Sequence, residues 1–306
     1  MAVLGCLACL PAAPPPKTAI RQIRVPVWAD ARADQPLTLA DLHARLAGTD
    51  VRVVRLRGPQ DDLMILTVLD MVGDLSYVEP AKDALVREIE KLPPATYVGL
   101  MRAQDGLRVM IDPTADREAA TEAVRNLPVS GKAGFLDTVE MAARVGEGIL
   151  SKTSVRVAIL YVTDSEIENY REDYTNPVIN SSDTHDLSRR FPEALIQEKF
   201  SKLTATMMSW QAPVFVVHLR YRGDRLGEAY QNGLKQIAEL TGGASIFCRS
   251  SAEIPEAVHR MIGLISSQYS VTLAVPERKF KHVQVQLDAE DKRPLNYRTR
   301  FFLKTR

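Results

Sequence analysis

The sequence predicts an α/β fold: a doubly wound, mostly parallel sheet flanked by helices, with a small accessory part rich in β structure. Two observations predict the central part, namely short, nearly continuous apolar runs and the amphipathic stretches that alternate with them. A third observation predicts the accessory part, because segments in which polar and apolar residues alternate stand at both ends of the chain.

The strands of the central sheet are predicted from the apolar runs. Helices cover a parallel sheet on both faces, so each buried strand is expected as a continuous apolar run. The run at Leu107–Ile111 is short and is expected at an edge of the sheet. The expected strands are Leu63–Leu69, Tyr97–Met101, Leu107–Ile111, Val155–Val162, Val214–Leu219 and Ser245–Phe247.

The helices are predicted from apolar residues that recur three or four positions apart, as on one face of a helix. Pro93-Pro94 and Thr241-Gly242-Gly243 supply stop signals. The expected helices are Val78–Leu92, Arg117–Leu127, Leu136–Leu150, Glu193–Trp210 and Leu226–Leu240, followed by one on which Ile254, Val258, Ile262 and Ile265 share a face.

The N-terminal flank, residues 20–60, is predicted to be rich in β structure. It contains two partly alternating segments, Ile23–Trp28 and Val51–Leu56, which are expected as strands. Between them, Leu37–Leu42 has the pattern of one or two helical turns.

The C-terminal flank, residues 269–306, contains three alternating segments that are expected to form an antiparallel meander. They are Tyr269–Val275, His282–Leu287 and Tyr297–Leu303. Each flank alone has too few strands to be stable, so we expect both flanks to form one joint accessory sheet. This sheet is expected beside an α/β domain of residues 61–268.

Composition excludes several classes of protein. The 306 residues are 45% hydrophobic and 25% charged, which excludes disorder and collagen-like repeats. The formal net charge of +1 gives no global field that favours nucleic acid, so no nucleic-acid partner is expected. With only 3 Cys, a disulfide scaffold is excluded, and the core must supply the stability.

Residues 1–19 have the pattern of a signal-peptide remnant, with a disordered tail as the alternative. Met1–Leu10 is apolar and is followed by a Pro-rich stretch, but no Lys or Arg precedes it. We therefore expect an exported protein, secreted or periplasmic, with Cys6 or Cys9 as candidate sites of a lipid anchor. No later stretch approaches the ~18 apolar residues of a membrane span.

Acidic residues follow two strands of the expected sheet, at the edge where an open parallel sheet binds its ligands. Asp70 ends the first strand, Asp74 stands four residues later, and Asp164 follows Val155–Val162. Neighbouring carboxylates repel one another unless a cation or a proton lies between them, and a hard divalent metal is a natural candidate. Helix capping and pairing with Arg or Lys are the alternative roles.

These segments resemble the von Willebrand factor type A family. In that family a first strand ends in D-x-S-x-S, a later loop supplies a Thr and a further strand ends in T-D-G. The matching segments are Asp70–Asp74, Ser130–Asp137 and Thr163–Ser165. The resemblance covers about Leu63 to Gln268 in element order, and with its flanks the chain is similar to the secreted bacterial proteins called VWFA-related.

The resemblance implies a metal-ion-dependent adhesion site, in which hydroxyls and water-bridged carboxylates hold Mg²⁺ and a partner's carboxylate completes the coordination. Asp70 and Asp164 match the two Asp of the motifs, whereas Val72, Asp74 and Ala133 stand where the family has Ser, Ser and Thr. Mg²⁺ requires near-ideal octahedral oxygen ligation, and Val72 and Ala133 remove two hydroxyl ligands without supplying another side-chain oxygen. The sequence therefore predicts a degenerate site without a cofactor, with Asp70, Asp74 and Asp164 as the ligands of any Mg²⁺ or other divalent cation that still binds.

A candidate partner-binding segment, Ser165–Arg190, leaves the sheet beside Asp164. It is long and polar, and loops of that length are usually functional or disordered. Aromatic rings among mixed charges are typical of protein interfaces, although a solvated loop is the alternative. The candidate residues are Tyr170, Tyr174, Asp183 and His185.

The sequence predicts a protein that is not an enzyme. It contains no nucleophile elbow, phosphate-binding loop or dinucleotide motif, and His218 and Cys248 are expected as buried core residues. We therefore expect a non-catalytic module that binds a protein ligand without metal. Two alternatives stay open: a structural or assembly component that self-associates through the accessory β sheet, and a metal-dependent hydrolase that uses the Asp70, Asp74 and Asp164 cluster.

Overall fold

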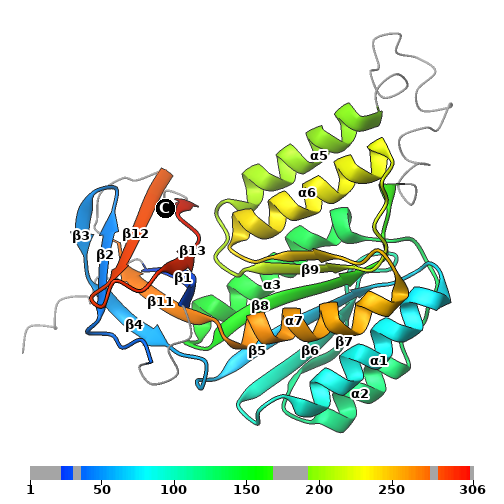
Figure 1. Cartoon of the computed structure of the whole chain (residues 1–306), viewed down its shortest axis with the longest axis horizontal. Coiled ribbons are helices and arrows are strands. Elements are labelled where there is room, and N and C mark those ends of the chain that lie inside the picture. Colours follow the sequence, from blue (N-terminus) through cyan, green and yellow to red (C-terminus); the bar gives the residue numbers. More distant parts are fainter. Residues whose placement is uncertain (1–21, 30–35, 168–191, 276–281, 304–306) are drawn as a thin grey trace, which may run out of the picture.

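The computed structural model describes residues 22–29, 36–167, 192–275 and 282–303. Its central sheet has six strands in the order β10-β9-β8-β5-β6-β7 (Figure 1). Neighbouring strands are parallel except β7, which lies at one edge and is antiparallel to β6. The strands are β5 (Leu63–Asp70), β6 (Thr96–Arg102), β7 (Arg108–Thr114), β8 (Arg156–Thr163), β9 (Val214–His218) and β10 (Ser245–Phe247). The predicted doubly wound α/β fold, including its edge strand, is confirmed.

Helices cover both faces of this sheet (Figure 1). One face packs on α1 (Leu75–Lys91), α2 (Arg117–Arg125) and α7 (Ile254–Ser266). The other face packs on α3 (Phe135–Lys152), α5 (Pro192–Met207) and α6 (Arg225–Thr241). Because both faces are covered, every residue of β8 is buried, which explains why the strand appears in the sequence as an apolar run. None of the described helices is long and apolar enough to cross a lipid bilayer.

The chain order creates a switch point between β5 and β8. After β5 the chain continues to β6 and β7, and it then returns to β8 on the other side of β5. The carboxyl ends of the two strands meet, with Asp70 paired with Thr163. In open α/β sheets, ligands bind in the crevice beyond such a point.

The two flanks pair with each other, but they form two four-stranded sheets, so the prediction of one joint sheet is wrong. The orders are β13-β1-β11-β4 and β14-β12-β2-β3. A single sheet leaves its apolar face exposed, whereas these two bury their apolar side chains against each other. The strands are β1 (Gln22–Ala29), β2 (Leu42–Leu46), β3 (Thr49–Val51), β4 (Val53–Arg57), β11 (Tyr269–Ala274), β12 (His282–Ala289), β13 (Leu295–Tyr297) and β14 (Arg300–Phe302).

Two local predictions in the flanks are also wrong, the second in part. The helical turns expected at Leu37–Leu42 are a turn in which Asp41 accepts hydrogen bonds from the main-chain N–H and hydroxyl of Thr38, and strand β2 follows. The expected meander is incomplete: β12 pairs with β14 as expected, but β11 pairs with β1 and β4 and does not pair with β12. Alternation identifies a strand, but it does not identify partners that lie about 200 residues away in the chain.

The two four-stranded sheets form a sandwich, and its edge strands are short. At each edge, a strand of one sheet leads directly into a strand of the other. Strands β4 and β3, at one edge of each sheet, are separated only by Arg52, and β13 and β14 are separated only by Arg298 and Thr299. The corner residues keep backbone pairing, because the carbonyl oxygens of Arg52 and Thr299 accept from Ala274 and Val285. Each of these edge strands is therefore short or ends in a corner, so it offers few free backbone groups to which another strand could be added.

The α/β part is inserted between β4 and β11, two strands that are neighbours in one sheet. Arg156, at the start of β8, lies at the junction and is 2% exposed. Its guanidinium donates to the carbonyl oxygens of Pro59 and Asp61 in one connection and of Ser266 and Gln268 in the other, at 2.6–3.0 Å. One buried side chain therefore holds both connections.

Two further arginines, both from the sandwich, bind main-chain carbonyls of the α/β part. Arg24 donates to Thr153 and Val155, and Arg298 donates to Met208 and Trp210. Arginine suits this role because its planar group presents several fixed donors.

Candidate functional site

Asp70 lies at the switch point, at the end of β5, and is completely buried. Its two carboxylate oxygens accept hydrogen bonds from the main-chain N–H groups of Gly134 and Phe135, at 2.8 and 3.1 Å, and from the Thr163 hydroxyl at 2.9 Å. These N–H groups begin α3, where unpaired donors and the helix dipole favour a negative charge. Burial raises the pKa of Asp70 to about 6, although these bonds oppose the change.

Asp164 follows β8 and is 8% exposed. Its oxygens accept from the main-chain N–H groups of Val72 and Gly73, at 3.0 and 2.6 Å, so the carboxylate holds the loop that follows β5. A Cβ at Gly73 would lie 2.6 Å from an Asp164 oxygen, which means that this close approach requires glycine. Burial raises the pKa of Asp164, and the two N–H bonds oppose the change.

Asp74 has a different role, as the N-cap of α1. Its side chain is exposed and accepts from the main-chain N–H of Ser76 at 2.8 Å, a bond that lowers the pKa of Asp74. The structure therefore brings Asp70 and Asp164 to adjacent strand ends but does not gather the three carboxylates around one point. In the part of the chain that the structure describes, no three His, Cys, Asp or Glu side chains are grouped so as to hold a metal ion.

The remaining positions of the implied adhesion site supply no side-chain oxygen. Val72 is half-buried, and Ala133, two residues before α3, is 4% exposed. Mg²⁺ takes oxygen ligands in near-octahedral geometry, whereas both buried carboxylates are already used by main-chain donors. These residues do not fit a bound Mg²⁺.

A guanidinium group supplies positive charge at this edge instead. Arg220, two residues after β9, lines a hollow of about 100 Å³ together with Asp164 and Asp74. Its group lies 5.8 Å from the centre of the Tyr77 ring and 3.7 Å from the Glu166 carboxylate. The charge of Arg220 lowers the pKa of both Asp74 and Asp164, although in each case it is a lesser influence than hydrogen bonding or burial.

Behind this edge lies a buried chain of hydroxyl groups. Thr163 bonds Ser165 at 2.7 Å, and Ser165 bonds the Tyr230 hydroxyl at 2.8 Å. His218, 1% exposed, places Nε2 2.9 Å from the carbonyl oxygen of Ser165, and burial lowers its pKa to about 4. The prediction that His218 is a hydrogen-bonded core residue is confirmed. Cys248 is also buried, as expected, and burial raises its pKa to about 11.

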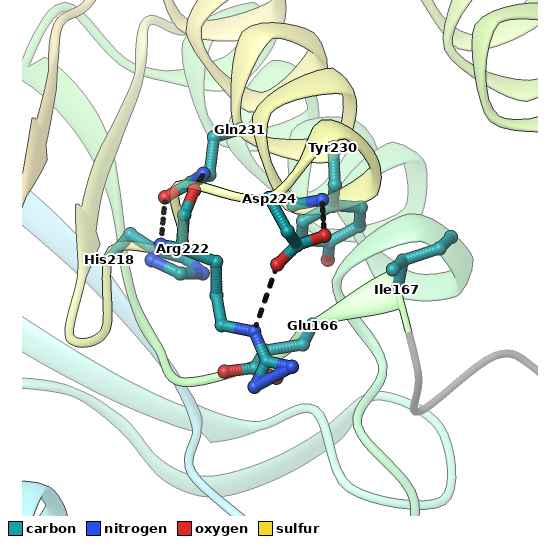
Figure 2. Close-up of a pocket in the computed structure, with 8 residues that line it drawn as sticks. Glu166, Ile167, His218, Arg222, Asp224, Tyr230 and Gln231 are labelled. Atoms are coloured by element: carbon teal, nitrogen blue, oxygen red, sulfur yellow. Dashed lines mark hydrogen bonds and ion pairs between the residues drawn. The ribbon is translucent and has the colours of Figure 1, made fainter. Parts of the chain in front are cut away.

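Figure 2 shows the pocket beside His218. Arg222 lies between two carboxylates, 2.9 Å from Glu166 and 3.3 Å from Asp224, and its main chain bonds Gln231. The cavity measures about 10 Å³, which is far below the size of an ordinary small-molecule site. The polar groups here hold the loop after β9 against α6.

The predicted partner-binding residues, Tyr170, Tyr174, Asp183 and His185, lie outside the described residues, as do Cys6 and Cys9. Sequence reasoning examined the acidic residues after the strands but missed the arginines there. Arg220 and Arg249 stand two residues after β9 and β10, so the rule that singled out Asp70 and Asp164 also applies to them.

Solved structures resemble this fold at low sequence identity. The von Willebrand factor type A protein of Catenulispora acidiphila is 12% identical, with 93% of this chain and 74% of that chain covered and a TM-score of 0.47. An aerotolerance-related membrane protein from Bacteroides fragilis is 16% identical, with 66% and 98% covered and a TM-score of 0.41. A mutant of the PilB minor pilin from Streptococcus sanguinis is 10% identical, with 68% and 62% covered and a TM-score of 0.50.

These similarities concern the fold alone. Comparison with protein-family models and with curated proteins found no match. A fold alone does not determine a function, which depends on the residues at the sheet edge.

Proposed function

We propose that this chain is a non-catalytic, protein-binding module of the von Willebrand factor type A kind, which binds its partner without a divalent cation. The observation that carries the proposal is the use of Asp70 and Asp164. Four main-chain N–H groups donate to these two carboxylates, so they serve as loop and helix anchors. Arg220 supplies permanent positive charge beside Asp164 and Asp74, where the family places a metal.

A binding role is supported by what lies at this edge. Exposed aromatic and arginine side chains, which are typical of the centres of protein interfaces, stand beside the switch point. They include Tyr221, 39% exposed, and Arg220, whose side chain is 45% exposed. Catalysis lacks support, because His218 and Cys248 are buried and the pocket beside His218 is too small for an organic substrate.

Self-association through the accessory sheet has less support than binding at this edge, because the sandwich edges are short and turn corners. Export is part of the proposal, on the apolar and Pro-rich pattern of residues 1–16.

The test is a melting-temperature titration with Mg²⁺, Mn²⁺ and Ca²⁺, because a ligand that binds only the folded state must stabilise it. We expect no shift at millimolar metal in the wild type. The matched variants are Asp74→Ala, which removes an exposed carboxylate, and Asp83→Ala, which removes one on α1. A shift of several degrees that is lost in Asp74→Ala and kept in Asp83→Ala would overturn metal independence.

Binding itself is tested by affinity capture from the source organism in EDTA and in Mg²⁺. A partner retained equally in both buffers, and released by Tyr221→Ala, supports the proposal. Retention that requires Mg²⁺, or that survives every change at this edge, contradicts it.

A further inference from the structure

We propose that the partner presents an acidic peptide segment, and that Arg220 and Arg249 bind its carboxylates. This inference rests on the proposed protein-binding role and names the chemistry of the partner. It follows from the positions of the two arginines, from their contacts and from the use of the acceptors around them.

The two arginines follow neighbouring strands at the same edge of the sheet. Strands β9 and β10 are parallel, with His218 paired with Phe247, and each arginine stands two residues after the end of its strand. The main-chain N–H of Tyr221 donates to the carbonyl oxygen of Cys248 at 2.7 Å, so the pairing extends beyond the strands.

Each arginine packs over a tyrosine ring. The Arg220 group lies 5.8 Å from the centre of the Tyr77 ring, and the Arg249 group lies 5.7 Å from that of Tyr221. Such packing holds the guanidinium plane while its N–H edge stays available, which suits bidentate recognition of a carboxylate.

The hydrogen bonds at this edge indicate the charge of the ligand. Four carboxylates at this edge already accept main-chain N–H groups: Asp74 from Ser76, Asp164 from Val72 and Gly73, Asp224 from Gly227, and Glu253 from Arg249. A fifth carboxylate, Glu166, pairs with Arg222 at 2.9 Å. The two guanidinium groups, in contrast, donate no hydrogen bond within the described residues. The ionic contact of Arg220 with Glu166 is 3.7 Å, longer than a hydrogen bond. Unused donors beside used acceptors call for an acceptor-rich ligand.

An acidic peptide fits this edge better than a small anion. The two groups rest on different rings and so offer two separate forks, which two carboxylates of one chain can fill together. Leu75, 58% exposed at the start of α1 near Tyr77, adds apolar surface for the peptide stem.

The test uses fluorescein-labelled decaglutamate, followed by fluorescence anisotropy in EDTA with the full chain. We expect wild type to bind decaglutamate, to bind decaserine at least tenfold more weakly, and to lose affinity as salt rises. The double variant Arg220→Gln, Arg249→Gln is expected to bind at least tenfold more weakly. The matched control, Arg87→Gln with Arg260→Gln, changes two exposed arginines on α1 and α7 and is expected to stay within twofold.

The outcomes separate this inference from the proposed function. Absence of decaglutamate binding, or equal binding by the arginine double variant with an unchanged melting temperature, overturns the inference and leaves a metal-free module with another kind of partner. Binding that requires Mg²⁺ but is lost in the double variant overturns metal independence while the arginine role stands. Equal binding of decalysine also overturns the inference.

Discussion

Arg156 offers the sharpest test of how the two parts of the chain are joined. Its guanidinium donates to four carbonyl oxygens, two in each of the connections that link the sandwich to the α/β part. We expect Arg156→Met, which keeps the length of the stem and removes every donor, to destabilise the protein strongly. Burial lowers the pKa of Arg156 to about 10, so the group is still charged at neutral pH.

The expected size follows from the surroundings of the four acceptors. A hydrogen bond to a charged group contributes about 1.5–3 kcal/mol, so four of them set an upper bound of roughly 6–12 kcal/mol. Only the bond to Gln268 is fully buried, and water can reach the other three acceptors after truncation. The methionine also avoids the desolvation of a charge. We therefore expect a loss of about 3–5 kcal/mol in the free energy of unfolding, which corresponds to roughly 5–8 °C in Tm.

The assay is chemical denaturation followed by circular dichroism, with a thermal melt alongside. Arg87→Met, at an exposed arginine on α1, is the control and is expected to change stability by at most about 0.5 kcal/mol. Arg156→Lys keeps the charge but has fewer directed donors, so it should fall between wild type and Arg156→Met. A loss below about 1 kcal/mol for Arg156→Met would refute the view that this side chain holds the junction.

Two further predictions concern the sheet edge and a helix. The pKa of Asp70, about 6 in the fold against 3.8 ordinarily, means that the folded state keeps a proton that the unfolded chain loses. This proton therefore stabilises the fold below about pH 4, and the contribution of about 3 kcal/mol is lost as the pH rises to 6. The test is the free energy of unfolding as a function of pH. We expect wild type to lose stability over this range and Asp70→Asn not to show that loss. Gly73→Ala should lower the free energy of unfolding by about 1–3 kcal/mol, because the new Cβ meets the Asp164 carboxylate. The control Gly148→Ala, in open space on α3, should raise it by about 0.5–1 kcal/mol. A Gly73→Ala protein as stable as wild type would contradict the anchoring role of Asp164.

The central sheet was predictable because its physics is local. Strands such as Val155–Val162 are buried on both faces, so the apolar run alone identifies them. The accessory strands were harder, since β2 pairs with β12 across more than 200 residues and no local pattern encodes that choice. The short β2 segment also overlaps the end of the Leu37–Leu42 pattern, where a Thr38–Asp41 turn gives helix-like spacing without a helix.

The candidate site was predictable in position but not in chemistry. The strand ends placed Asp70 and Asp164 correctly beside each other. Their partners are main-chain N–H groups of loops at residues 72–73 and 134–135, and the donors of a loop depend on its path, which the sequence does not show. For the same reason, the pairing of Arg220 with Tyr77 from α1 became visible only in the fold.

The insertion of the α/β part between β4 and β11 has a consequence for how the chain folds. These strands are adjacent, yet Arg57 and its partner Ser270 are separated by more than 200 residues of chain. Closing a flexible loop of that length costs about 5 kcal/mol of entropy, plus a constant. A folded α/β part removes that cost because it already holds both ends together. The sandwich therefore depends on its insert as a hairpin depends on its turn. We expect the last strands to pair only after the insert has folded, and we expect both parts to unfold in one transition.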